Sequence, residues 1–316
     1  MQKIKVSLIG YGYWGPKLAR NFQNSNFFNL VSIVDTSQKN LNTAKKDFPL
    51  VQTNKNYKDI LNIRNISLVV ISTPTKTHFQ IAKFVLENGK HALVEKPLSI
   101  SLNDVSKLEK LAKVNKKFLF VDYPFLFSGS INYIKKMIDS KKYGDLLEIE
   151  SYREQAPIRK DTNVIWDLGT HDISILTYLL KKQPYKIQTI KKKNFQNPLC
   201  DTAYINLKYK NNLNVLIKNS WVSPTKIRLI KIKFKNAILY SDENESLYKV
   251  KIFKNKLKKD WGKYNLEIPE IDLNEPLARM VNYIFYAIKN NNNYLFSGKF
   301  NEKVTYLLEK INKIND

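Results

Sequence analysis

Near its start the chain reads Lys3-Ile4-Lys5-Val6-Ser7-Leu8-Ile9, followed at once by Gly10-Tyr11-Gly12-Tyr13-Trp14-Gly15-Pro16. Polar and apolar residues alternate over the first of these stretches, which predicts a β-strand. Residues 17–22 read as the beginning of a helix, and Pro16 suits a first helical turn because its missing N–H costs no hydrogen bond there. The whole stretch therefore predicts a strand, a tight glycine turn and a helix.

The glycines of this turn follow the pattern G-x-G-x-x-G. We expect Gly10 to permit the turn, Gly12 to let a pyrophosphate approach the backbone, and Gly15 to let the helix pack closely on the strand. The start of the helix then offers unpaired N–H groups and a positive dipole end to the phosphates. The pattern predicts a dinucleotide site, with an ordinary glycine turn as the alternative.

A second apolar stretch, residues 30–34, ends in Asp35, twenty positions after Gly15. This is where a dinucleotide-binding unit places the acid that receives the adenosine ribose hydroxyls, and Thr36 follows it. A carboxylate there favours NAD over NADP because it repels a 2′-phosphate, although Lys39 nearby weakens the preference. The alternative for Asp35 is a turn or helix-capping residue.

Strand-like and helical stretches alternate up to residue 123, which predicts a right-handed, doubly wound parallel sheet of the α/β class. The apolar run 68–71 leads into Ser72-Thr73-Pro74-Thr75-Lys76-Thr77-His78, and the run 91–94 leads into Glu95-Lys96-Pro97. Residues at the carboxyl ends of parallel strands meet at one sheet edge, so we expect both segments to contact the cofactor. His91, at the start of its strand, is expected to be structural.

From residue 146 onward strands dominate, joined by short polar turns, which predicts a second domain of α+β type with a largely antiparallel, open sheet. One helix, from about 165 to 180, interrupts these strands, and another, 277–289, is expected to close the chain. We place the domains at 1–123 and 124–316. The expected strands of the second domain are 146–152, 187–190, 202–209, 214–220, 226–234, 237–240 and 247–253.

Length and composition narrow the class of protein. With 316 residues, two domains are more natural than one, because a single core stops growing at about 250–300 residues. No apolar run reaches the roughly 20 residues of a membrane span and no signal-peptide pattern is found, so we expect a cytoplasmic protein without a membrane partner. Cys200 is the only cysteine, which excludes an internal disulfide, and we expect it to be a buried filler; no metal site is predicted.

The net charge of +25 raises the question of nucleic-acid binding. Only six of the 53 basic residues are arginine, and the lysines are spread along the chain without any nucleic-acid-binding motif. We therefore expect no nucleic-acid partner, and keep such binding as a minor alternative. A general positive field would still help to collect an anionic nucleotide substrate.

The predicted helix near residue 165 carries Trp166-Asp167-Leu168-Gly169-Thr170-His171-Asp172. Asp167 and His171 are four residues apart, so on a helix they share one face. A carboxylate beside an imidazole can raise the basicity of the ring and fix its orientation, as general-base catalysis requires. A capping or surface interaction is the alternative for this pair.

Taken together, these segments resemble the Gfo/Idh/MocA family, named for glucose-fructose oxidoreductase, inositol dehydrogenase and a rhizopine-catabolism protein. The resemblance covers nearly the whole chain and rests on the order and spacing of the glycine turn, Asp35, Ser72–His78, Glu95-Lys96-Pro97 and Asp167–His171. The stretches Ser220–Arg228 and Glu275-Pro276-Leu277 are similar to members that act in polysaccharide and nucleotide-sugar biosynthesis.

The resemblance implies an N-terminal Rossmann domain and a C-terminal domain whose open sheet builds homodimers or homotetramers, with the nicotinamide between the domains. Lys96 would then hydrogen-bond the reacting hydroxyl, His171 would remove or return its proton, and Asp167 would orient the site. The Lys96–Pro97 peptide is expected to be cis. The cofactor-binding residues implied are Gly10, Gly12, Tyr13, Trp14, Gly15, Asp35, Thr36, Ser72, Thr73, Pro74, Thr75, His78, Glu95, Lys96 and Pro97.

The implied substrate-binding residues are Lys96, Tyr123, Arg159, Asn163, Asp167 and His171. Two departures from the family pattern fall among or beside them. Tyr123-Pro124 stands where similar members carry His-Thr, and Ala156-Pro157 stands where they carry Leu-Gly, just before Arg159 and Asn163. Both changes are expected to touch the substrate wall.

These observations lead to a hypothesis of function. We expect an NAD-dependent oxidoreductase that moves a hydride between nicotinamide and a ring secondary alcohol of a sugar, most readily a nucleotide sugar for surface polysaccharide. An inositol or free-sugar dehydrogenase is the first alternative. A nucleotide-binding regulatory protein that has lost turnover is an alternative of another class. The departure from the family pattern at Tyr123-Pro124 is the reason for considering it.

Overall fold

The computed structural model describes residues 3–194, 199–255, 264–296 and 299–314. By its internal contacts the chain forms two compact units. Unit 1 comprises Met1–Pro124 and Glu275–Thr305, and unit 2 comprises Phe125–Asn274 and Tyr306–Asp316.

Unit 1 is built on a six-stranded sheet in the order β3-β2-β1-β4-β5-β6, and all of its strand pairs are parallel. From β1 the chain adds β2 and β3 on one side of the sheet, and then β4, β5 and β6 on the other side. The loops that follow β1 and β4 therefore flank the switch point, where doubly wound sheets bind their ligands. The strands are β1 Ile4–Ile9, β2 Phe28–Val34, β3 Gln52–Asn54, β4 Ile66–Ile71, β5 His91–Glu95 and β6 Leu119–Asp122.

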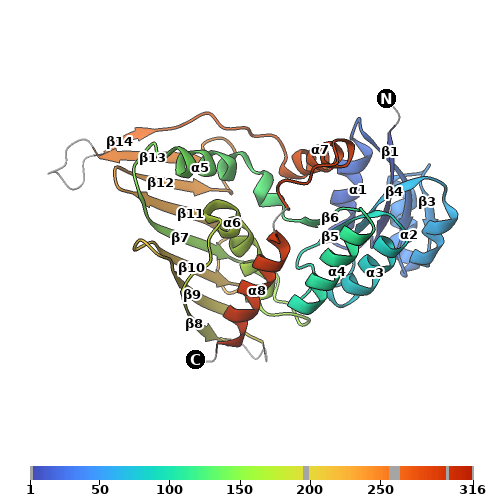
Figure 1. The fold of residues 1–316 in the computed structure, drawn as a ribbon, viewed down its shortest axis with the longest axis horizontal. Helices are drawn as coiled ribbons and strands as arrows, with labels where there is room; N and C mark the ends of the chain where they lie inside the picture. The colour runs from blue at the N-terminus through green and yellow to red at the C-terminus, as the bar shows by residue number, and fades with distance from the viewer. Residues whose placement is uncertain (1–2, 195–198, 256–263, 297–298, 315–316) are drawn as a thin grey trace. The chain divides into compact units, whose positions relative to one another are not determined.

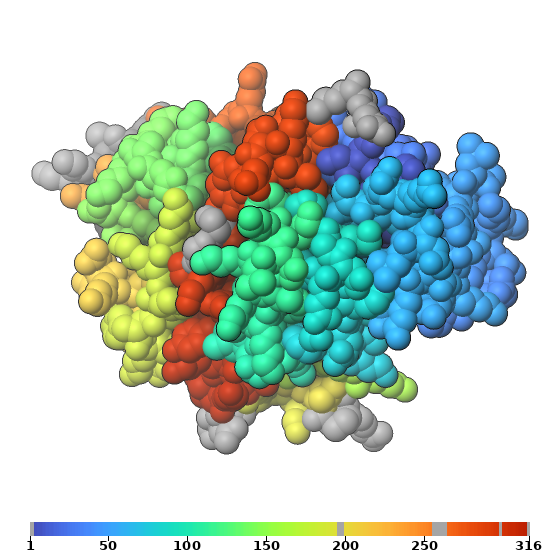
Figure 2. Space-filling model, turned by 45° about the vertical axis from the view of Figure 1, so that its right-hand side comes forward, coloured from blue at the N-terminus to red at the C-terminus, as the bar shows by residue number. Residues whose placement is uncertain are grey.

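Two helices of unit 1, α2 and α4, begin at a serine whose side chain caps them. The Ser37 hydroxyl accepts the backbone N–H of Asn40 at the start of α2, and the Ser101 hydroxyl accepts that of Asp104 at the start of α4. Figure 2 shows α3 and α4, in cyan to blue-green, side by side on the surface of this unit. The bounds are α1 Gly15–Gln23, α2 Gln38–Asp47, a 3₁₀ turn η1 Tyr57–Asn62, α3 Thr75–Glu87 and α4 Leu102–Val114.

A late segment of the chain returns to unit 1. Helix α7 (Pro276–Lys289) packs beside α1, and its buried Phe285 stacks on Phe27 with ring centroids 4.2 Å apart. This division differs from the predicted second domain, 124–316, because residues 275–305 bury their apolar side chains against the first unit.

Unit 2 is built on an eight-stranded sheet in the order β14-β13-β12-β11-β7-β10-β9-β8. Among the described strands of this sheet, only β7 and β10 pair in parallel and the other pairs are antiparallel, as the sequence predicts. The strands are β7 Leu146–Glu154, β8 Lys186–Lys192, β9 Thr202–Lys208, β10 Asn214–Ser220, β11 Ile227–Phe234, β12 Ala237–Asp242, β13 Val250–Asn255 and β14 Tyr264–Glu267.

Helices cover one face of this sheet, on the side of α5 (Gly129–Ser140) and α6 (Thr170–Leu180) in Figure 1. Burial alternates along the strands, so that Leu239 is fully buried while the neighbouring Ile238 and Tyr240 are half-buried. The predicted helix near residue 165 is α6 preceded by one π-helical turn, η3, at Ile165–Gly169. A 3₁₀ turn, η2, spans Pro124–Phe127.

The elements β3, α5, β14 and α8 (Phe300–Lys313) were not expected from the sequence, and one expectation was wrong. Strands β3 and β14 are too short to show a periodic pattern, whereas α5 does bury Ile131, Ile134 and Met137 at helical spacing. The helix at 277–289 does not close the chain, because α8 follows it. Among the described residues, no helix combines the length and apolar character of a segment that crosses a bilayer.

Candidate functional site

The glycine turn has the geometry that its pattern predicts. Gly10 has φ +96°, and a Cβ there would collide with the carbonyl oxygen of Ser72 at the end of β4. A Cβ on Gly15 would collide with the carbonyl oxygen of Gly10, so only glycine allows this approach of helix to turn. At Gly12 a Cβ would meet nothing within 4 Å. The turn is thus tight at its two ends and open at its middle glycine.

Asp35 ties this turn to the end of β2. One carboxylate oxygen accepts the backbone N–H of Tyr11 at 2.6 Å and the Asn40 side-chain amide at 3.2 Å, and the other accepts the N–H of Ser37 at 2.8 Å. Asp35 therefore acts in part as a turn residue, which is the alternative to ribose binding considered for it. Its half-buried carboxylate and the exposed Thr36 remain at the edge where the ribose is predicted to bind.

Helix α3 begins at Thr75, so the segment Ser72–His78, in which cofactor contacts are predicted, includes the first residues of this helix. His78, in the first turns of α3, is buried, with Nδ1 2.9 Å from the Pro97 carbonyl oxygen and Nε2 2.8 Å from that of Thr73. Burial lowers the pKa of His78 below its ordinary value, and the carbonyls partly oppose this. His78 thus joins the two loops in which the cofactor contacts are predicted, as a neutral ring at neutral pH.

Lys96 follows directly on β5, and the Lys96–Pro97 peptide is cis, as expected. The Lys96 side chain is half-buried, and Pro97 is buried. In the register of the parallel sheet, Glu95 lies opposite Asp122 of β6. Lys96 is therefore attached directly to the carboxyl end of a buried parallel strand.

Asp122 lies at the same sheet edge and is not among the site residues predicted from the sequence. Its side chain is fully buried, and Oδ2 accepts the indole N–H of Trp14 at 2.6 Å. Burial raises the pKa of Asp122 to about 6, although the Trp14 hydrogen bond and the charge of Lys96 both lower it. Its position at the carboxyl end of a strand was the available signal.

Tyr123 is buried within unit 1. Only 2% of the residue is exposed, and its ring stacks on Phe296 and meets Phe300 edge-on. Burial raises the pKa of Tyr123 above its ordinary value, as do the carboxylates of Glu109 and Glu95. The side chain belongs to the aromatic core of unit 1, a role that the prediction of a substrate wall did not include.

In unit 2, Asp167 lies in the π-helical turn and is held from two sides. The indole N–H of Trp221 donates to Oδ2 at 3.0 Å, and the Arg159 guanidinium lies 3.6 Å from Oδ1. Arg159 also forms a two-point ion pair with Asp161, at 2.7 and 3.0 Å. Two of the predicted substrate-binding residues, Arg159 and Asp167, are thus brought together, and Trp221 is a further residue of this group.

His171 stands at the start of α6, half-exposed, with its ring edge-on to Phe125 at a centroid distance of 5.0 Å. The Arg153 guanidinium lies over the same Phe125 ring, 4.3 Å from its centroid, and forms a buried ion pair with Asp172. Asp172 also accepts hydrogen bonds from Ser151 and Asn219, at 2.8 and 2.6 Å. This buried cluster fixes the first turn of α6 to β7 and β10.

Asn163 serves as a cap. Its Oδ1 accepts the N–H groups of Ile165 and Trp166, at 3.1 and 3.2 Å, and its amide donates to Asn312 at 2.8 Å. The structure thus gives the Asn163 side chain a role in starting the helix that carries Asp167, which the prediction of substrate binding did not include.

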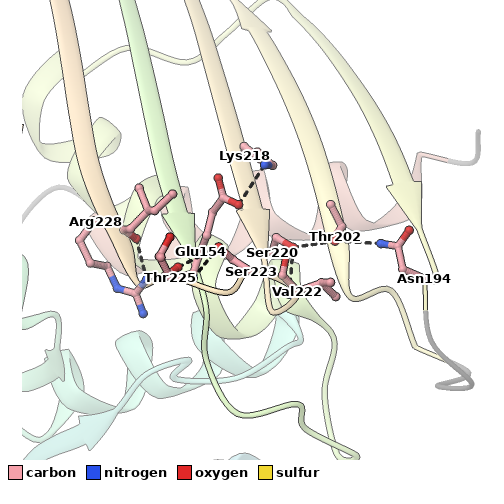
Figure 3. A network of polar contacts seen from close by, with 10 residues as sticks. Glu154, Asn194, Thr202, Lys218, Ser220, Val222, Ser223, Thr225 and Arg228 are labelled. Carbon is pink, nitrogen blue, oxygen red and sulfur yellow. Dashed lines mark hydrogen bonds and ion pairs between the residues drawn. The ribbon is translucent and has the colours of Figure 1, made fainter.

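Polar contacts continue along the adjacent strand ends (Figure 3). Lys218 forms an ion pair with Glu154 at 2.9 Å, the hydroxyl groups of Thr202 and Ser220 are 2.8 Å apart, and Arg228 donates to the Glu154 carbonyl oxygen. Burial and the nearby Arg153 lower the pKa of Arg228 to about 10. These contacts join β7, β9, β10 and β11 at the edge from which the Arg159 and Trp221 segments leave the sheet.

The remaining candidates are structural. His91 accepts the N–H of Phe118 at Nδ1, and burial together with Lys117 lowers its pKa to about 4. Cys200 is buried, and burial raises the pKa of its thiol. In the part of the chain that the structure describes, no three or more histidine, cysteine or acidic side chains gather as a metal site requires.

Two family models match the chain. Residues 4–123 match the model described as an oxidoreductase family with an NAD-binding Rossmann fold, and residues 131–236 match the GFO/IDH/MocA C-terminal domain. A 1-carboxy-3-chloro-3,4-dihydroxycyclohexa-1,5-diene dehydrogenase of Comamonas testosteroni is 26% identical over 187 residues, which are 56% of this chain and 47% of that protein. The match therefore spans about half the length of this relative.

Other relatives match over more of their length. A myo-inositol 2-dehydrogenase of Thermotoga maritima is 23% identical over 69% of this chain and 68% of its own. Among solved structures, a UDP-N-acetylglucosamine 3-dehydrogenase of Acidithiobacillus ferrooxidans superposes with a TM-score of 0.85 over 98% of this chain and 97% of its own, at 19% identity, which shows a common fold. With both domain models matched in order, the chain belongs to the Gfo/Idh/MocA family of oxidoreductases, whose N-terminal domain is an NAD-binding Rossmann fold.

Proposed function

We propose that this protein is an NAD-dependent dehydrogenase or reductase acting on a ring secondary alcohol of a sugar. The observation that carries the proposal is the placement of Lys96. It follows a parallel strand of an NAD-binding sheet, half-buried, at the edge that also carries the glycine turn. A cation fixed at this edge is suited to an oxygen on which negative charge develops.

The residues of unit 1 fit a bound dinucleotide. The backbone is open at Gly12 and closed to any other residue at Gly10 and Gly15, as a pyrophosphate cradle requires. Asp35 offers a carboxylate to ribose hydroxyls at the end of β2, and we propose that it makes NAD the preferred cofactor over NADP. When bound, the nicotinamide accepts or returns the hydride of the reaction.

In this proposal, Lys96 and His171 carry out the steps other than hydride transfer. The Lys96 ammonium hydrogen-bonds the reacting oxygen and stabilises its alkoxide character, while His171 takes or returns the proton. Of the three histidines, burial lowers the pKa of both His78 and His91, so neither is poised to exchange protons near neutral pH. Asp167, held by Trp221 and Arg159, orients the His171 end of the site.

For the substrate, we propose a nucleotide-linked sugar, with an inositol or a free sugar as the alternative. Among the relatives, one is named a UDP-N-acetylglucosamine 3-dehydrogenase and another a myo-inositol 2-dehydrogenase, so each supports one of these classes. The net charge of +25 favours the nucleotide sugar, because it attracts a substrate that carries two phosphates. A role in surface polysaccharide synthesis is part of this proposal.

A spectrophotometric screen tests the proposal. The protein is incubated with NAD or NADH and a panel of nucleotide sugars, free sugars and inositols, and absorbance of the reduced nicotinamide is followed. Turnover with a nucleotide sugar is the expected result. Bound cofactor without turnover on any member of the panel would instead support a regulatory, nucleotide-binding protein.

The assignment of Lys96 predicts the effect of its removal. Lys96→Ala should lower kcat by about 10²- to 10⁴-fold, the range of a lost acid–base or charge-stabilising group, while the Kd for NAD stays within about threefold. Lys83→Ala, which removes an exposed lysine of α3 paired with Glu87, is the matched control and should leave both values unchanged. Wild-type turnover in Lys96→Ala would refute the role.

We further propose that the open face of the unit 2 sheet joins copies of the chain into a dimer or tetramer. This face carries a groove of about 320 Å³ that extends over β11, β12, β13 and β14 and is lined in part by Tyr240, Phe253 and Tyr264. Tyr240→Glu should introduce a charge into the interface and lower the mass measured by light scattering toward that of a monomer. A monomeric wild-type protein at micromolar concentration would contradict the proposal.

A further inference from the structure

Asp122 stands between the two elements that unit 1 contributes to the proposed site. It ends β6, beside the strand that delivers Lys96, and its Oδ2 accepts the indole N–H of Trp14 in the glycine turn. The other oxygen, Oδ1, is buried and has no hydrogen-bond partner among the residues that the structure describes. A single carboxylate thus lies next to both the nucleotide turn and the proposed active-site lysine.

A carboxylate is a costly choice for this position. An asparagine would offer Trp14 the same acceptor oxygen without placing a charge in the interior, where burial disfavours the ionised form. The raised pKa of Asp122 shows that the Trp14 hydrogen bond and Lys96 do not fully offset this cost. Buried charges held against their solvation occur preferentially at functional sites. Compared with an asparagine, the carboxylate of Asp122 adds a negative charge that attracts the ammonium group of Lys96.

We propose that Asp122 is a positioning residue: as a carboxylate it holds the Lys96 ammonium in place and links it, through Trp14, to the glycine turn. The inference rests on the proposed role of Lys96 and extends it. Its consequence is that the state of the nucleotide turn and the orientation of Lys96 are coupled through one buried side chain. Protonation of Asp122 removes this negative charge and so weakens the attraction that helps to orient Lys96.

The charged and titratable groups near Asp122 come from three segments. Glu95 and Lys96 belong to the end of β5, Lys17 of α1 lies over the Trp14 ring at 4.1 Å from its centroid, and Tyr123 follows Asp122 in the chain. Tyr123 is neutral at any pH of interest because burial raises its pKa. Lys96 lowers the pKa of Asp122, so loss of the Lys96 charge must raise it.

The first test needs no turnover. Emission from Trp14 is obtained by comparing each protein with the same protein carrying Trp14→Phe, and is followed between pH 4.5 and 8. We expect a transition with its midpoint near pH 6. It should vanish in Asp122→Asn and move to higher pH in Lys96→Met. A transition that survives Asp122→Asn, or a midpoint that Lys96→Met leaves unchanged, would overturn the inference.

The second test separates positioning from folding. Asp122→Asn keeps the acceptor for Trp14 and removes a buried charge, so at pH 7.5 its thermal midpoint should equal or exceed that of the wild type. Its kcat should nevertheless fall by about tenfold or more, because a displaced ammonium no longer meets the reacting oxygen. The acidic limb of the kcat/KM profile should become less steep in Asp122→Asn, because the contribution of Asp122 is lost, and Trp14→Phe should move that contribution to higher pH.

Glu109→Gln is the matched control for these measurements. Glu109 of α4 is a half-buried carboxyl group of unit 1, and its desolvation raises its pKa to about 7. Its replacement should also raise the thermal midpoint, but should change neither kcat nor the Trp14 transition. Wild-type kcat in Asp122→Asn would refute the inference. Absence of turnover in the wild type would refute the proposed function instead, and the Trp14 titration would still decide the coupling of Asp122 to Lys96.

Discussion

At the scale of single residues, Asp35 has two tasks whose effects differ between the two nucleotides. Its two carboxylate oxygens accept the backbone N–H groups of Tyr11 and Ser37, which shapes the turn, and its negative charge should repel a 2′-phosphate. Asp35→Asn removes the charge and keeps only one of the two acceptor oxygens, so the loss at the turn affects both nucleotides and the loss of charge affects their ratio. We expect the ratio of the Kd for NADP to the Kd for NAD to fall by roughly tenfold, or about 1.4 kcal/mol.

Titration calorimetry with both nucleotides measures this ratio. Asp59→Asn, which removes a carboxylate from η1 of the same unit, is the control and should leave the ratio unchanged. Equal losses of affinity for the two nucleotides in Asp35→Asn would show that the residue shapes the turn without selecting the cofactor.

The structural role of a residue could be predicted from the sequence where local backbone geometry allows only one residue type. Gly10 and Gly15 allow no Cβ, and a strand followed by G-x-G-x-x-G announces this without any knowledge of the rest of the chain. The surroundings of Tyr123 and Asp122 could not be predicted in the same way. Tyr123 is buried by Phe296 and Phe300, and Asp122 is paired with Trp14, 108 residues away in the chain.

At the scale of elements, α7 is the segment whose place was least evident. Its amphipathic pattern predicts a helix, but the same apolar stripe could pack on either unit. The stacking of Phe285 on Phe27 and its edge-on contact with Phe28 attach the helix to unit 1. Helix existence is thus readable from periodicity, whereas the partner of its buried face depends on distant residues.

This packing predicts a large loss of stability when it is removed. Phe285 is 3% exposed, so Phe285→Ala should lower the free energy of unfolding by about 3–5 kcal/mol, the usual cost of truncating a buried aromatic side chain. Tyr286→Ala, on the same helix but with half of the residue exposed, should cost clearly less. Urea denaturation measures both. A small effect of Phe285→Ala would show that α7 does not contribute to the core of unit 1.

At the scale of the whole molecule, the sequence predicts the two sheets and their types but not the path of the chain between the units. The parallel sheet follows from strict strand–helix alternation, and the antiparallel sheet from short turns. The return of residues 275–305 to unit 1 is a long-range packing event that no local pattern encodes. A boundary near residue 124 is readable because the strand–helix alternation stops there.

The pH dependence of global stability can be argued from two half-buried groups, the acid Glu109 and the base His91. Burial raises the pKa of Glu109 from 4.5 to about 7, so between these values the folded chain holds a proton that the unfolded chain has lost. The free energy of unfolding attributable to Glu109 therefore falls as the pH rises through this window. His91, whose pKa is lowered from 6.5 to about 4, has the opposite effect: its contribution rises with pH between 4 and 6.5, because the unfolded chain there binds the extra proton.

Glu109→Gln isolates the first of these effects. The amide oxygen can still accept the hydrogen bond that Asn301 donates to Glu109, so packing is kept while the titration is lost. We expect the variant to match the wild type near pH 4.5 and to become more stable by about 3 kcal/mol above pH 7, the free energy that corresponds to the raised pKa. Denaturant unfolding across this range measures the difference. A constant difference at all pH values would show that Glu109 is not ionised at a cost in the folded protein, and that the fall in stability with pH has another source.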